Sequence, residues 1–195
     1  AAVAVGGVIF RAWVMAVAGT EIHDNALPAR MQRLQRTVAL GLLVVVAAGK
    51  GLDVSILTNT VGIPLWRAIT APFAVAGMTT CAGAVLLFAA ASRHPQRVSV
   101  VEMMAALAIL AGLVATTHAT GRVDARAWLV VVSALHQAGA AAWLGGLPFF
   151  LVVLGASLGE ETRARIAHRY SNLCVLSVMT IALSLIGIGI MAYYD

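Results

Sequence analysis

The sequence predicts an all-α protein, a single domain built as a polytopic transmembrane helical bundle of about six spans. Hydrophobic residues make up 61% of the chain and charged residues 11%, whereas a soluble domain carries about 25% charged residues. The mean hydropathy is +0.94. The length of 195 residues holds about six helices of roughly 20 residues each, with short connections. These quantities favour a membrane protein over a soluble domain.

Six apolar runs, separated by short polar segments, mark the predicted spans. They cover residues 3–19, 37–57, 68–91, 99–117, 127–158 and 168–194. The fifth run is longer than a bilayer requires, so we expect it to tilt or to bend near Gly145, Gly146 and Pro148. Arg11 interrupts the first run. Because an isolated charge in hydrocarbon is costly, we expect Arg11 to pair inside the bundle or to reach toward the interface.

The basic residues are distributed unevenly between the two sides of the predicted bundle. When the adjoining ends of the spans are counted with each connection, eight arginines belong to the 1–2, 3–4 and 5–6 connections, and four basic residues belong to the 2–3 and 4–5 connections. The first group comprises Arg30, Arg33, Arg36, Arg93, Arg97, Arg163, Arg165 and Arg169, and the second Lys50, Arg67, Arg122 and Arg126. Because cytoplasmic loops are enriched in Lys and Arg, both termini and the hairpin containing His118 are expected on the outer face. The formal charge of +5 reflects these loops, so the expected partner is the lipid bilayer and not a nucleic acid.

Two histidines are candidate ligands. His136 lies in the fifth run, roughly 14 Å from its outer boundary at the helical rise of 1.5 Å per residue. A ring nitrogen at that depth needs a partner, which is either a hydrogen-bonding group on a neighbouring helix or a metal or haem. His118 lies at the outer end of the fourth run and differs from His136 in depth by about 10 Å. The two could mark an outer site and a deeper site.

Soft ligands form a second candidate group. Met78 and Cys81 are three residues apart, so they share one face of the third helix. Their depth of about 15–20 Å is similar to that of His136. Thioether, thiolate and imidazole together suit Cu(I), although Met and Cys also fill apolar cores. Cys174 and Met179 reach comparable levels from the other side, and both cysteines are expected to be free thiols.

The remaining polar residues indicate structural roles. Glu102 lies near the start of the fourth helix, where a negative charge is favourable. Lys50 and Asp53 are three residues apart and are expected to pair. The chain has no Gly-rich phosphate loop, no H-E-x-x-H pair and no nucleophile elbow, so no enzyme activity is predicted.

Several stretches are similar to one family of membrane proteins. The strongest is LHQAGAAAWLGGLPFF (residues 135–150), which resembles the LHxxxxxxWxGGL signature of the CopD family, the inner-membrane copper resistance D proteins. Three shorter stretches are similar to other motifs of that family: TTHA (116–119), HRYSNL (168–173) and TVGIPLWR (60–67). The resemblance covers about residues 55–190.

The resemblance implies copper passage across the bacterial inner membrane, together with periplasmic copper carriers. It gives ligand roles to His118 and His136, and packing roles to Trp143, Gly145 and Gly146. Members of the family commonly have about eight spans, and this chain has room for about six. It also lacks Met-rich external loops.

Three functions are compatible with the sequence. The first is copper handling, as a permease or a copper donor, with transient Cu(I) binding at His136, Met78 and Cys81 and an outer site at His118. The second is electron transfer by a subunit that binds b-type haem, with His118 and His136 as axial ligands or with one of them beside another ligand. The third is a structural subunit of a larger membrane complex, in which the histidines only form hydrogen bonds.

Overall fold

The structure is a computed structural model that describes residues 1–17, 26–91, 97–117 and 126–194. Every regular element within these ranges is helical. The elements are α1 (Ala2–Trp13), the 3-10 turn η1 (Met15–Val17), α2 (Leu27–Asn59), α3 (Leu65–Thr70), α4 (Pro72–Ala90), α5 (Val100–Ala115), α6 (Arg126–Ala140), the π-helix η3 (Ala141–Gly145), α7 (Gly146–Leu154) and α8 (Glu160–Tyr194). The all-α prediction is therefore confirmed for the described part of the chain.

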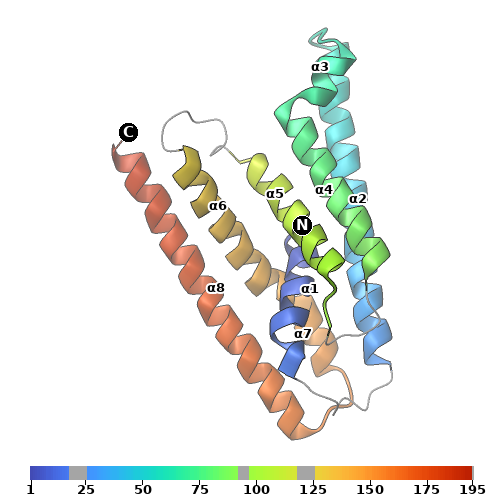
Figure 1. Cartoon of the computed structure of the whole chain (residues 1–195), viewed down its shortest axis with the longest axis vertical. Coiled ribbons are helices and arrows are strands. Elements are labelled where there is room, and N and C mark those ends of the chain that lie inside the picture. Colours follow the sequence, from blue (N-terminus) through green and yellow to red (C-terminus); the bar gives the residue numbers. More distant parts are fainter. Residues whose placement is uncertain (18–25, 92–96, 118–125, 195) are drawn as a thin grey trace.

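The helices around α1 run alternately up and down (Figure 1). In the view of Figure 1, α2 rises, α4 descends, α5 rises, the segment from α6 to α7 descends and α8 rises. The short helix α1 lies inside the bundle, where it packs against η3, α7, α5 and α2. This arrangement places the N-terminal ends of α2 and α8, which are rich in arginine, at the lower end of the bundle.

Among the residues that the structure describes, four helical segments are long and apolar enough to cross a membrane. They are Leu27–Asn59, Pro72–Ala90, Ala127–Leu154 and Glu160–Gly189. The other two apolar runs form shorter helices, α1 with 12 residues and α5 with 16. At 1.5 Å per residue, α1 is only about 18 Å long, less than the roughly 30 Å of a hydrocarbon core. The predicted count of about six spans is not confirmed.

Some helix boundaries differ from the prediction. Helix α2 begins at Leu27 rather than at residue 37, because Leu27, Met31 and Gln35 recur at helical spacing and are all buried. The predicted span 68–91 is divided between α3 and α4 at Ala71, whose extended backbone (ψ 146°) precedes Pro72. Proline disfavours a helical conformation in the residue before it.

The fifth predicted span is interrupted where a bend was expected. The π-helix η3 separates α6 from α7 and ends at Gly145. A π-helical turn breaks the regular i→i−4 hydrogen bonding, and the Trp143 carbonyl accepts a hydrogen bond from the Tyr170 hydroxyl at 2.7 Å. Tyr170 thereby ties α8 to η3.

Helix α1 contacts η3 through glycine. An added Cβ at Gly6 would lie 2.2 Å from the Ala141 carbonyl oxygen, and one at Gly145 would lie 2.0 Å from the Ala2 carbonyl oxygen. Any larger residue at either position would therefore separate the two backbones. This is the close packing expected of Gly145, and it places α1 at the centre of the fold.

Large apolar side chains cover the outer faces of the long helices. Val45 on α2 is 71% exposed, and Leu183 on α8 is 66% exposed. In water such a surface would be unfavourable, whereas lipid tails solvate it. The apolar helices are thus compatible with contact to a lipid bilayer.

Candidate functional site

His136 lies on α6 and forms a hydrogen bond to α8. Its Nδ1 is 3.1 Å from the Oγ of Ser184, and that Oγ is also 2.7 Å from the carbonyl oxygen of Ile181. A hydroxyl has one hydrogen. Because the Ile181 carbonyl can only accept, Ser184 donates to Ile181 and accepts from Nδ1 of His136.

The hydrogen bond to Ser184 selects one form of the His136 ring. The hydrogen of the neutral imidazole is on Nδ1, so Nε2 carries a lone pair, and Nε2 forms no hydrogen bond to any described residue. An outer partner of this kind fixes the tautomer and orientation of histidines that bind metals. The same bond also satisfies the structural alternative, in which the ring is simply a hydrogen-bonded part of the α6–α8 interface.

Met78 and Cys81 line one groove. This groove has a volume of about 330 Å³ and is bounded by α2, α3 and α4. Its lining comprises Ala47, Lys50, Gly51, Val54, Ile69, Ala74, Gly77, Met78 and Cys81. Met78 is 55% exposed, and Cys81 is a partly buried free thiol. We call it the Met78–Cys81 groove.

Lys50 gives the Met78–Cys81 groove a charged edge. The Lys50 ammonium is 2.8 Å from a carboxylate oxygen of Asp53, which confirms the predicted pair. It also lies 5.4 Å from the centre of the Phe73 ring. The Lys50 stem packs on Gly77, where an added Cβ would lie 2.6 Å from Lys50 Cγ. Asp53 offsets the positive charge, so the edge of the groove is ionic but not strongly cationic.

The structure does not bring His136 together with Met78 and Cys81. Helix α4 packs against α2, α3 and α5, whereas α6 packs against α1, α5, α8 and η3. In Figure 1, α5 lies between α4 and α6. His136 and the Met78–Cys81 pair therefore lie at two separate places in the bundle.

Of the remaining candidates, Cys174 and Met179 contribute little to either place. His118 lies outside the described residues. Cys174 packs beside the core cluster around Phe10 and Tyr170, and Met179 is 57% exposed on α8. Within the described ranges, no group of three or more His, Cys, Asp or Glu side chains is placed to hold a metal ion.

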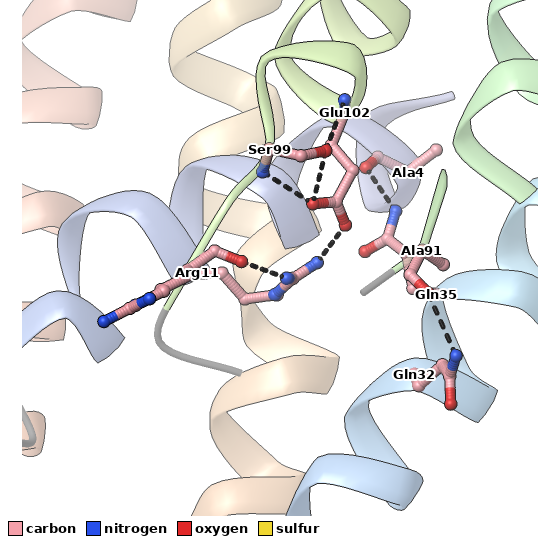
Figure 2. A network of polar contacts seen from close by, with 8 residues as sticks. Ala4, Arg11, Gln32, Gln35, Ala91, Ser99 and Glu102 are labelled. Atoms are coloured by element: carbon pink, nitrogen blue, oxygen red, sulfur yellow. Dashed lines mark hydrogen bonds and ion pairs between the residues drawn. The ribbon is translucent and has the colours of Figure 1, made fainter. Parts of the chain in front are cut away.

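A buried ionic network connects α1 to the start of α5 (Figure 2). Arg11 is 2% exposed and Glu102 is 0% exposed. Nη1 of Arg11 donates to Oε1 of Glu102 at 2.5 Å, and Nη2 donates to the Arg97 carbonyl at 2.7 Å. The other carboxylate oxygen of Glu102 accepts from the backbone N–H of Ser99 at 2.8 Å and from its hydroxyl at 3.1 Å. Ser99 and Glu102 thus form a capping box, and Arg11 has the partner that its depth requires.

Gln35 is a second buried polar link to α1. Its Nε2 donates to the Ala4 carbonyl at 3.0 Å, as Figure 2 shows. Its Oε1 is buried and has no hydrogen-bond partner among the described residues. An unsatisfied buried acceptor is unfavourable, so Gln35 fixes the position of α1 at some cost in stability.

The sequence predicted each half of the Arg11–Glu102 pair but not the pair itself. Arg11 was expected to find a partner within the bundle, and Glu102 was assigned only a favourable position at a helix start. Apart from Asp53, which was assigned to Lys50, Glu102 is the only acidic residue within the six predicted spans, and this is the signal that could have connected the two charges. The Ser184 partner of His136 carries no comparable signal, because α8 contains several hydroxyl residues.

Comparisons with known proteins do not assign this chain to a group. No protein-family description, no curated protein and no solved structure matches it.

Proposed function

We propose that this chain is an integral membrane protein that handles Cu(I), as a permease or as a copper donor. The observation that carries the proposal is that Met78 and Cys81 line one groove on a helix long enough to span the membrane. A thioether and a thiolate are soft ligands that select Cu(I) over harder cations. The resemblance of residues 135–150 to the CopD signature supports the same chemistry.

In this proposal the ligands form separate Cu(I)-binding sites, each of which we call a station. Met78 and Cys81 hold Cu(I) transiently in their groove. His136 offers Nε2 at a second station, with Ser184 holding the ring in the required tautomer. His118 supplies the outer site. Transient binding suits a cargo ion, because a site with few ligands releases its ion more readily than a closed one.

The proposed topology has six crossing segments in a bacterial inner membrane. The short helices α1 and α5 cross only part of the hydrocarbon layer or cross it within the surrounding long helices. The arginine-rich end faces the cytoplasm, so the C-terminus lies outside. Alkaline phosphatase fused after Asp195 should then be active, because it needs the oxidising periplasm for its disulfides. An inactive fusion of normal abundance would reverse the orientation.

A b-type haem at His136 is the second candidate function. It is favoured by the same Ser184 hydrogen bond, which leaves Nε2 as a potential axial ligand. Electron transfer would then replace copper handling. A single set of measurements separates the two candidates.

The test is an ultraviolet–visible spectrum of the detergent-purified protein, combined with elemental analysis for copper and iron and a copper-tolerance assay in cells. Copper handling predicts bound copper without a Soret band, and a loss of bound copper and of tolerance in Met78→Leu and Cys81→Ser. Met179→Leu is the matched control, because Met179 is equally exposed but lies outside the groove.

The outcomes differ for each function. A dithionite-sensitive Soret band with stoichiometric iron, abolished in His136→Ala, would replace copper handling by haem binding. Ser184→Ala should lower metal affinity at His136 by about 10-fold or more if that ring is a ligand, as loss of such outer partners does in metal sites. A protein with neither metal, whose copper tolerance is unaffected by every variant, would be a structural subunit.

A further inference from the structure

A second groove lies between the end of α1 and α8. It has a volume of about 380 Å³ and is lined by Trp13, Arg169, Asn172, Val175 and Leu176. This volume is at the lower end of the roughly 300–1,000 Å³ of ligand-binding pockets. The Trp13–Arg169 groove shares no residue with the Met78–Cys81 groove and does not include His136.

The lining changes from polar to apolar along α8. Arg169 and Asn172 form the part nearest the start of the helix, and Val175 and Leu176 lie farther along it. At 1.5 Å per residue, Val175 is about 9 Å beyond Arg169 along the helix axis. The groove thus presents hydrogen-bond donors at one end and apolar side chains at the other. An amphipathic ligand, with a polar head and an apolar tail, matches this lining.

The position of the groove matches a membrane–water boundary. Trp13 lies at the C-terminal end of α1 and is 47% exposed. Tryptophan is enriched at such boundaries because its ring is largely apolar and its N–H is polar. The C-terminal end of α1 and the N-terminal half of α8, which together form the groove, lie in the lower part of the bundle (Figure 1).

The charge of Arg169 is not compensated by a carboxylate among the described residues, where the ion pairs are Arg11–Glu102 and Lys50–Asp53. Asn172 uses its side-chain amide nitrogen in a 3.3 Å contact with Nε2 of His168. That nitrogen has two hydrogens, so one remains for a ligand. A guanidinium and an amide N–H are donors suited to phosphate oxygens.

We propose that the Trp13–Arg169 groove binds an anionic phospholipid. Arg169 and Asn172 donate hydrogen bonds to the headgroup phosphate, Trp13 packs beside the glycerol region, and one acyl chain lies against Val175 and Leu176. Basic pockets between membrane helices are suited to anionic headgroups, and their attraction adds to the burial of the chain. This site is independent of the proposed copper chemistry.

The experiment is a native mass-spectrometric titration of the detergent-purified full chain. Phosphatidylglycerol and phosphatidylcholine with identical acyl chains are the probes. We expect one tightly retained phosphatidylglycerol, bound at least tenfold more tightly than phosphatidylcholine. Arg169→Gln should weaken phosphatidylglycerol binding about tenfold, the usual effect of losing a charge-assisted hydrogen bond, and should leave phosphatidylcholine binding unchanged.

Arg30→Gln is the matched control. Arg30 is exposed at the same end of the bundle, so the substitution removes the same charge from the same side without altering the groove. If Arg30→Gln and Arg169→Gln lower the affinity for phosphatidylglycerol equally, the effect comes from general surface charge, and the proposal is overturned. Equal binding of the two lipids by the unmodified protein would do the same.

Two further measurements complete the test. Displacement of phosphatidylglycerol by millimolar glycerol phosphate would assign the groove to a soluble phosphate compound instead of a lipid. If Arg169→Gln lowers the thermal stability of the lipid-free protein, Asn172→Leu is the substitute, because Asn172 is exposed and its loss removes one phosphate donor. Unchanged lipid affinity in Asn172→Leu would then overturn the proposal.

Discussion

Glu102→Gln should destabilise the protein far more than the loss of a helix cap. Glutamine keeps an oxygen that accepts from Ser99, so the capping box at the start of α5 survives. What it removes is the charge opposite Arg11, whose side chain is 2% exposed. The variant therefore leaves a buried guanidinium without its counter-ion.

The expected cost follows from the geometry of the pair. Breaking a buried ion pair by removing one partner costs about 3–5 kcal/mol, because the remaining charge is uncompensated. Ser99→Ala removes only the cap and should cost about 1 kcal/mol. The double variant Arg11→Leu with Glu102→Gln removes both charges and keeps the cap. It should be within about 1 kcal/mol of the unmodified protein, because replacing both members of a buried pair is often neutral.

The assay is the free energy of unfolding in a reversible denaturant titration of the detergent-solubilised protein, followed by far-ultraviolet circular dichroism. The diagnostic result is a double variant that is more stable than Glu102→Gln alone. If the double variant instead loses as much stability as Arg11→Leu alone and Glu102→Gln alone lose together, the two charges act independently and do not form a stabilising pair, and the reasoning is refuted. A Glu102→Gln loss no larger than that of Ser99→Ala would refute it as well.

Two further substitutions test the packing around α1 and η3. Gly145→Ala places a Cβ 2.0 Å from the Ala2 carbonyl oxygen and should lower the free energy of unfolding by about 1–3 kcal/mol through overpacking. Gly41→Ala is the control, because a Cβ there would meet nothing within 4 Å, and it should be neutral or stabilising in the same titration. Tyr170→Phe removes the donor to the Trp143 carbonyl and should lower the free energy of unfolding by about 1 kcal/mol, so an unchanged value would mean that another group satisfies this carbonyl.

The class of the fold followed from composition, but the extent of each helix did not. Hydropathy marked the second span at residue 37, whereas α2 begins at Leu27. Half of the intervening residues, 27–36, are arginine or glutamine, yet the buried Leu27, Met31 and Gln35 recur at helical spacing. Helical periodicity persists where mean hydropathy falls, so periodicity would have placed this start more accurately.

Local pairs were predictable, and distant pairs were not. Lys50 and Asp53 are three residues apart on one helix, so the helical repeat alone makes them neighbours. The pairing of Arg11 with Glu102 depends on which faces of α1 and α5 meet. That choice is made by backbone packing, including the Gly6 contact that places α1 against η3. Such rotations are not encoded in spacing along the chain.

The packing of α4 on α5 restricts how the two candidate stations could cooperate. An added Cβ at Gly83 would lie 2.8 Å from the Ala105 carbonyl oxygen, and one at Gly112 would lie 2.7 Å from that of Ala76. The α4–α5 interface therefore has no room for an ion to pass. An apolar groove of about 380 Å³ lies instead between α5 and α6, and its hydrocarbon lining offers no ligand. A copper ion could therefore not pass directly from Met78 to His136 through the bundle. It would have to reach each of these residues from the membrane surface, or α5 would have to move relative to α6.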